Sequence, residues 1–200
     1  MPELRSALAG HLKPGRFGAA DEKLIISERP LGTLIQLSGW RDSFEGAARP
    51  LLARLGFDGV GAFDRAQASG TALAFRIAPE RVLLRLTSVN DWAAIARDVD
   101  AAVTPALDLS HSRALIRVAG VAAPDLMARL MPIDFDADVF TPGRFVQSGI
   151  HSTAVLAHRA DGGAGAPAFD IYMPRSFAAS LWDFITDTAL PLGFRVEANG

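Results

Sequence analysis

An internal repeat is the feature that most constrains how this 200-residue chain can fold. The segment Leu-Ile-Gln-Leu-Ser-Gly recurs downstream as Leu-Ile-Arg-Val-Ala-Gly, and in each case a proline and a leucine-rich stretch follow. Three pairs of segments match in the same order along the chain: 34–39 with 115–120, 50–55 with 124–130, and 73–79 with 168–174. Three ordered matches predict a duplication, with two halves of similar structure.

Strands are predicted where short runs of branched apolar residues end at a turn signal. Residues 34–38 and 114–118 are such runs, and each is stopped by a glycine. Residues 81–87 form a third run, which predicts a strand with at least one buried face. A last short strand is predicted at 194–197, after Pro191 and Gly193.

Two longer helices are predicted from apolar residues spaced three and four apart. Asn90 is expected to cap the first of them and Ser176 the second. Their apolar stripes consist of Trp92, Ile95, Ala96, Val99 and Val103 in the first, and Phe177, Leu181, Phe184 and Ile185 in the second.

Two prolines bear on the shorter helices of the repeat. Pro50 and Pro124 suit the first turn of a helix, where a missing N–H has no cost. Pro50 therefore argues against one long helix that starts at Asp42, and we predict a helix only after it.

The fold class follows from the element order, which reads strand, short helix, hairpin, helix, strand in each half. This order predicts an α+β protein of two pseudo-symmetric β-α-β-β-α-β-like halves, similar to ferredoxin-like units, with mixed or antiparallel sheets and helices on one face. We expect an extended arm at 1–22, a first half at 23–104 and a second half at 105–200. The arm has no apolar period, so we expect it to pack on another chain or only loosely. Residues 161–167 predict a flexible hairpin loop or a short linker.

Composition indicates a subunit that buries surface against other chains. Apolar residues make up 50% of the chain and charged residues only 21%, and arginine outnumbers lysine by 18 to 2. Interfaces favour arginine over lysine, although codon bias would produce the same ratio. The formal charge of −2 gives no electrostatic basis for binding nucleic acid, and no apolar run is long enough for a membrane span.

Motifs for metal, phosphate and thiol chemistry are missing from the sequence. There are 0 cysteines, which fits a reducing compartment, and no pair of histidines has the spacing of metal ligands. The four histidines are His11, His111, His151 and His158; the last two should point to opposite faces of one unbroken strand. The acidic run 134–138 lacks the glycine and the final glutamate of a calcium loop, so we interpret it as a solvated loop. The glycines at 59–61 and 163–165 do not continue into a phosphate-binding loop.

Other chemistry-bearing residues have ordinary structural explanations. Asp-Leu-Ser-His at 108–111 holds the residue types of a catalytic triad, but a strand that ends in a polar turn explains it better. Arg144 and Arg175 could each hold a carboxylate, although a lone arginine does not define a binding site. The three tryptophans are assigned to core packing: Trp40, Trp92 and Trp182.

Residues 108–113, Asp-Leu-Ser-His-Ser-Arg, and the strand 116–120 that follows resemble the folate-binding family of the glycine-cleavage T-protein. The hairpin at 77–84 resembles the same family. Residues 174–182, Pro-Arg-Ser-Phe-Ala-Ala-Ser-Leu-Trp, are similar to the last helix of the gamma-subunit family of heterotetrameric sarcosine oxidases, and 6–10 also fits that family. The resemblance covers nearly the whole chain and implies a T-protein-like fold.

The resemblance supplies no catalytic, cofactor-binding or metal-binding residue. T-proteins have an Asn, a Gly and then an Asp that handles folate chemistry on a central hairpin. The matching stretch at 147–155 keeps Gly149 and Ile150 but not the Asn and the Asp. We therefore expect none of the three kinds of site in this chain.

The resemblance implies a non-catalytic structural subunit of a cytoplasmic complex that oxidises sarcosine or a related secondary amine. That complex would pass the one-carbon unit to tetrahydrofolate. The partners would be alpha, beta and delta subunits: FAD, FMN, NAD and tetrahydrofolate would bind to alpha and beta, and delta would bind zinc. Two alternatives stay open: a stand-alone folate-binding one-carbon-transfer enzyme, and a pterin-binding regulator.

Overall fold

The structure is a computed structural model that describes residues 5–87, 96–97, 99–160 and 165–197. The chain divides into two compact units. Met1–Pro30 and His111–Gly200 form the first unit, and Leu31–Ser110 forms the second. The sequence-based division into an arm at 1–22 and two α+β halves at 23–104 and 105–200 stays a prediction.

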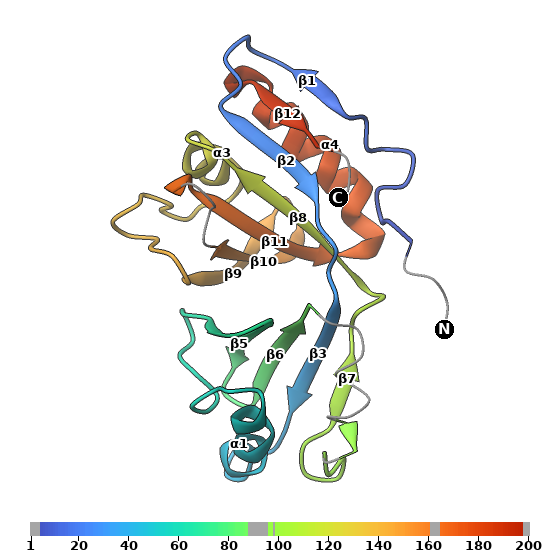
Figure 1. The fold of residues 1–200 in the computed structure, drawn as a ribbon, viewed down its shortest axis with the longest axis vertical. Coiled ribbons are helices and arrows are strands. Elements are labelled where there is room, and N and C mark those ends of the chain that lie inside the picture. The colour runs from blue at the N-terminus through green and yellow to red at the C-terminus, as the bar shows by residue number, and fades with distance from the viewer. Residues whose placement is uncertain (1–4, 88–95, 98, 161–164, 198–200) are drawn as a thin grey trace. The chain divides into compact units, whose positions relative to one another are not determined.

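A seven-stranded sheet is the framework of the first unit (Figure 1). Its strands lie in the spatial order β1 (Gly15–Phe17), β12 (Phe194–Val196), β2 (Leu24–Glu28), β8 (Arg113–Ala119), β11 (Ala168–Pro174), β10 (Thr153–Ala160) and β9 (Phe145–Ile150). Only the pairing of β12 with β2 is parallel, and the other neighbours are antiparallel. The sheet is therefore mixed, as predicted.

Helices α3 (Ala123–Leu130) and α4 (Ala178–Ala189) cover one face of this sheet (Figure 1). Alternate residues of β8 and β11, among them Ile116 and Ile171, point to that face and are fully buried against the helices. Two short 3-10 turns flank α4, η2 (Arg175–Phe177) before it and η3 (Leu190–Leu192) after it.

The second unit is a smaller sheet with a helix on one face. Its five strands are all antiparallel and lie in the order β4 (Gln67–Ser69), β5 (Ala72–Ala78), β6 (Arg81–Leu86), β3 (Thr33–Ser38) and β7 (Ala106–Asp108). Helix α1 (Phe44–Arg54) buries Phe44, Ala48, Leu51 and Leu52 against alternate residues of these strands.

The predicted duplication is visible in the sheet topology. Strand β3 follows β4, β5 and β6 in spatial order, and β8 follows β9, β10 and β11 in the same way. Both strands lead into a helix, α1 or α3. The repeat segments 34–39 and 115–120 thus take equivalent places. The third match was wrong, because 73–79 forms β5, whereas 168–174 forms β11, whose counterpart by position is β6.

Close packing requires a glycine at the end of β3 and at the end of β8, which explains why both copies of the repeat contain one. A Cβ at Gly39 would lie 2.6 Å from the Phe44 ring, and a Cβ at Gly120 would lie 2.2 Å from the carbonyl oxygen of Lys23. Gly120 also has a φ of 125°, which side-chain-bearing residues rarely adopt.

Three expectations about helices were wrong or lie outside the described residues. Helix α1 begins at Phe44 and contains Pro50, whose ring is on the exposed side, so the predicted start at this proline was wrong. Ser176 does not cap α4: the capping position is Phe177, and no side chain caps it. The helix predicted over 90–103 lies partly outside the described residues, which exclude 90–95 and 98, and 101–103 form a turn.

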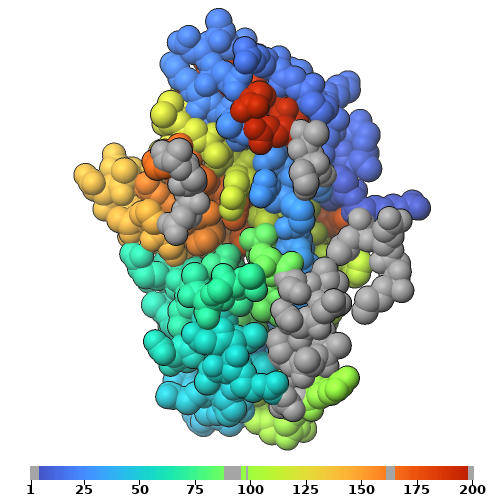
Figure 2. All heavy atoms as spheres, in the orientation of Figure 1, coloured from blue at the N-terminus to red at the C-terminus, as the bar shows by residue number. Residues whose placement is uncertain are grey.

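The N-terminal arm is anchored in the first unit, contrary to expectation. Leu8 is fully buried in the core, and Ala7 and Leu12 pack against that core. Glu28 accepts hydrogen bonds from the Ser6 hydroxyl and the Ala7 N–H, and β1 pairs with β12. Figure 2 shows the blue N-terminal segment beside the red residues of β12 on the surface.

The two sheets with helices on one face confirm the α+β prediction. The described part of the chain holds three α-helices, none of them long and apolar enough to cross a membrane.

Candidate functional site

A row of polar side chains crosses the middle of the seven-stranded sheet. The strand register places Ser27 beside Arg117, Arg117 beside Asp170, and Asp170 beside His158. Alternation along β8 and β11 puts this row on the face opposite α3 and α4. Ser27, Asp170 and His158 are all buried, so the row brings a hydroxyl, a carboxylate and an imidazole together away from solvent.

Arg117 and Asp170 form a two-point ion pair at the centre of the row. The Arg117 Nε–H and one Nη–H each donate to one Asp170 carboxylate oxygen, both at 2.7 Å. These hydrogen bonds raise the pKa of the Arg117 guanidinium above its ordinary value, because they outweigh the opposing effect of burial. Arg117 therefore stays charged at every physiological pH.

The geometry of this pair serves positioning better than proton transfer. Both oxygens of Asp170 are occupied as acceptors of N–H groups from a permanently charged partner. The pair also joins β8 to β11 at a fixed register. Among the described residues, no group of three His, Cys, Asp or Glu side chains could hold a metal ion.

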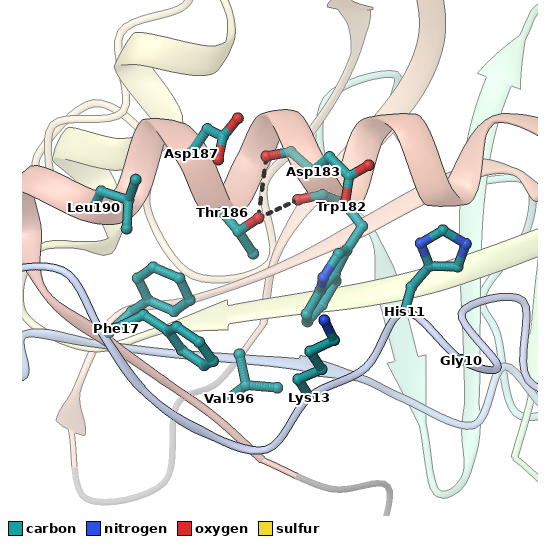
Figure 3. Close-up of a pocket in the computed structure, with 11 residues that line it drawn as sticks. Gly10, His11, Lys13, Phe17, Trp182, Asp183, Thr186, Asp187, Leu190 and Val196 are labelled. Atoms are coloured by element: carbon teal, nitrogen blue, oxygen red, sulfur yellow. Dashed lines mark hydrogen bonds between the residues drawn. The ribbon is translucent and has the colours of Figure 1, made fainter.

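A groove of about 290 Å³ lies in the first unit between the arm, α4 and β12 (Figure 3). Trp182 and the rings of Phe17 and Phe194 provide its apolar surface. The polar residues that line it are His11, Lys13, Asp183, Thr186 and Asp187. The groove combines an aromatic surface with charges of both signs.

The structure separates the four histidines. His11 lines the groove, His158 belongs to the polar row, and His111 is exposed. The expectation that His151 and His158 face opposite ways assumed an unbroken strand, and it does not apply because β9 ends at Ile150 and a turn precedes β10. His151 occupies that turn with a φ of 52°, and its ring centroid lies 3.9 Å from that of Phe184.

The segment 108–111 forms a polar turn at the end of β7. The Ser110 hydroxyl donates to Asp108 Oδ1 at 2.6 Å, and the Ser110 Oγ accepts the N–H of Leu34 at 2.9 Å. The Ser110 hydroxyl is thus committed to holding this turn against β3, as the structural interpretation predicted.

The two candidate arginines bind backbone carbonyls. Arg144 donates to the carbonyl of Val139, and Arg175 donates to the carbonyl of Ser6. In the acidic run, Asp134 accepts the N–H of Asp136 in a local turn.

The tryptophans differ from one another in exposure. Trp182 is buried in the core, as predicted. Trp40 is 73% exposed, so its assignment to the core was wrong. Trp92 lies outside the described residues.

Sequence reasoning missed both the polar row and the groove. Arg117 and Asp170 interrupt runs that are otherwise apolar, and a charge inside a buried strand is a signal that could have found the pair. The groove had no such signal, because Lys13 and Asp183 lie 170 positions apart and meet only through the arm.

Two sheets with this topology define the fold of the folate-binding T-protein type. The first comparison that shows it is heterotetrameric sarcosine oxidase from Corynebacterium sp. U-96, in complex with pyrrole 2-carboxylate. Its chain superimposes with a TM-score of 0.77 at 18% identity, over 94% of this chain and 96% of that one. Aminomethyltransferase T of the glycine cleavage system from Bartonella henselae matches with a TM-score of 0.66 at 17% identity.

The two comparisons differ in how much of the other protein they cover. The match to aminomethyltransferase T spans 88% of this chain but only 47% of that chain, about half its length. Scans against protein-family models and curated proteins find no match. At these identities, the structural similarity shows the fold of the chain.

Proposed function

We propose that this chain is the gamma subunit of a heterotetrameric oxidase of the sarcosine-oxidase type. The observation that carries the proposal is the end-to-end match to one chain of such an enzyme, which covers 94% of this chain and 96% of that one. The two chains are therefore of about equal length. The same assignment is supported by the resemblance of residues 174–182 to the gamma-subunit family. This segment forms the end of β11, the turn η2 and the start of α4.

The role we propose within the complex is structural. The buried charges of the first unit serve its own architecture, since Asp170 binds Arg117 and Glu28 holds the arm. The hairpin of β9 and β10 carries other residue types where the T-protein resemblance calls for Asn and Asp. Oxidation of sarcosine or a related secondary amine, with transfer of the one-carbon unit to tetrahydrofolate, is then the work of partner chains.

The partners we propose are alpha, beta and delta subunits in the cytoplasm. FAD, FMN, NAD and tetrahydrofolate would bind to alpha and beta. Both units expose large apolar side chains, which partner chains would cover on assembly. They are Phe17, Trp40, Phe63, Leu107, Val121, Val139, Phe177 and Leu190.

Affinity purification of the tagged chain from its native source tests the proposal. We expect co-purifying subunits that carry flavin absorbance, and sarcosine-dependent hydrogen peroxide formation by the complex but not by the isolated chain. The matched control is the same chain without its tag. Purification as a single colourless species with no partner, from cells grown on a secondary amine, would contradict the proposal.

A stand-alone folate-binding enzyme is the second candidate, favoured by the match to aminomethyltransferase T over 88% of this chain. Titration of the isolated chain with tetrahydrofolate separates the two. Saturable binding to the isolated chain supports this candidate, and its absence supports the structural subunit.

A further inference from the structure

The groove between the arm and α4 is built like a small binding site. Its floor is aromatic: Trp182 is 4% exposed, and the Phe17 and Phe194 rings stack with centroids 5.3 Å apart. A volume of about 290 Å³ is near the lower end for small-molecule pockets. A ligand of amino-acid size would fill it.

Charges of opposite sign line the two walls of this groove. In Figure 3 the Lys13 side chain reaches from the arm toward the Trp182 ring, with His11 farther along the same wall. Asp183 projects from α4 beside Trp182, whereas Asp187, one turn later, points away from the floor. In the part of the chain that the structure describes, neither Lys13 nor Asp183 forms an ion pair.

Thr186 adds a polar group to the helix wall. It points from α4 into the groove, and its hydroxyl donates to the carbonyls of Trp182 and Asp183 at 2.9 and 3.0 Å. Its hydrogen is thereby occupied, and the lone pairs of its oxygen remain free to accept a hydrogen bond. An ammonium group near Asp183 would find this second acceptor.

From this arrangement we infer that the groove binds a small zwitterion, a molecule with a carboxylate, an ammonium group and an apolar body. The carboxylate is held by Lys13 and the His11 imidazole, and the ammonium by Asp183 and Thr186. The apolar body lies on Trp182 and Phe17. A ligand with only one of the two charges meets an unpaired group of its own sign, which disfavours binding.

Calorimetric titration of the full chain with three matched compounds tests this inference. L-phenylalanine carries both charges, 3-phenylpropanoate only the carboxylate, and 2-phenylethylamine only the ammonium. Because a hydrogen bond to a charged group contributes roughly 1.5–3 kcal/mol, we expect phenylalanine to bind about tenfold more tightly than either partner compound.

Two charge-neutral variants separate the two contacts. In Lys13→Gln the preference over phenylethylamine should disappear while the preference over phenylpropanoate remains, and Asp183→Asn should show the reverse. Lys23→Gln, which changes the other lysine of the chain, and Asp58→Asn are controls that should change neither preference, because both residues are exposed outside the groove.

Equal affinity for the three compounds would overturn the inference, since it would mark a merely apolar groove. The inference would also be overturned if none of the three compounds bound the chain and if Lys13→Gln and Asp183→Asn each lost co-purification of the partners. That result would assign the groove to a protein contact. Because the titrations use the isolated chain, their failure leaves the proposed membership in an oxidase complex intact.

Discussion

Arg117 and Asp170, separated by 53 positions, meet side by side on β8 and β11 in a two-point ion pair. The environment of the two ends is unequal: the Asp170 side chain is 1% exposed, and that of Arg117 is 29% exposed. Water can therefore solvate the guanidinium in part, whereas the carboxylate depends on its protein partner. The stability of this region should respond most strongly to changes that leave one charge without the other.

Removal of the carboxylate should destabilise the fold. Asp170→Ala leaves Arg117 without its partner, and we expect a loss of about 3 kcal/mol in the free energy of unfolding, measured with urea. Asp125→Ala is the control: it breaks the exposed pair with Arg129 on α3 and should cost at most about 1 kcal/mol. Equal losses in the two variants would show that the buried pair has no special weight.

The contribution of Arg117 should not vary with pH near neutrality. A group whose pKa is raised in the folded state stabilises the fold below its unfolded pKa, and this stabilisation declines only as the pH rises through the folded value. For Arg117, hydrogen bonding to Asp170 raises the pKa above a value that is already far above neutral. The stability difference between the wild type and the double variant Arg117→Met, Asp170→Leu should stay constant from about pH 7 to about pH 9. A steady change over that interval would contradict this assignment.

The sequence predicted the framework because strand identity depends on local patterns. The repeat placed 34–38 and 114–118 in equivalent strands, and the structure confirms this as β3 and β8. The third match was wrong because apolar strands resemble one another whatever their position in a sheet, so 73–79 could match 168–174 without being its counterpart. Sheet order is set by long-range pairing, which composition does not encode.

The groove could not be predicted, for a related physical reason. Its walls come from opposite ends of the chain, and they meet because the arm packs on the first unit through Leu8 in the core, Ala7 and Leu12 against that core, and the pairing of β1 with β12. These contacts join segments that lie far apart in the sequence, so no local pattern encodes them. Arg117 and Asp170 are different, since each is a charge within a buried strand and the sequence alone marks both as unusual.

Leu8 should be essential for holding the arm. It is fully buried in the core of the first unit, so Leu8→Ala removes apolar contacts and leaves a cavity. We expect a loss of about 2–5 kcal/mol in unfolding free energy. Leu190→Ala, at a leucine that is 43% exposed, should change stability by no more than about 0.5 kcal/mol. Unchanged stability in Leu8→Ala would return the arm to its predicted role as a loosely packed segment.

Trp40 should contribute to assembly without contributing to stability. Its side chain is 73% exposed, and tryptophan is enriched among residues that dominate binding energy at interfaces. If the proposed complex forms, Trp40→Ala should weaken co-purification of the partners by about tenfold or more and leave the melting temperature unchanged. Arg41→Ala, at a neighbour whose side chain is 88% exposed, is the control. Full retention of partners in Trp40→Ala would place the interface elsewhere.

Helix α1 offers a test of the corrected role of Pro50. The helix runs from Phe44 to Arg54, so Pro50 lies in its interior, where it lacks the N–H that would bind the carbonyl of Gly46. The proline is exposed, and a Cβ at Gly46 would meet nothing within 4 Å. Gly46→Ala should therefore stabilise the protein by about 0.5–1 kcal/mol, and Pro50→Ala by about 1–3 kcal/mol.

The two variants also distinguish the observed helix from the one predicted by sequence. If the helix began at Pro50, Gly46 would lie before it, and neither substitution would stabilise the fold, since proline is favourable in a first turn. Urea unfolding followed by far-ultraviolet circular dichroism measures the difference, and Arg49→Ala, at an exposed residue of the same helix, is the matched control. Unchanged or lower stability in both Gly46→Ala and Pro50→Ala would mean that α1 starts later than Phe44.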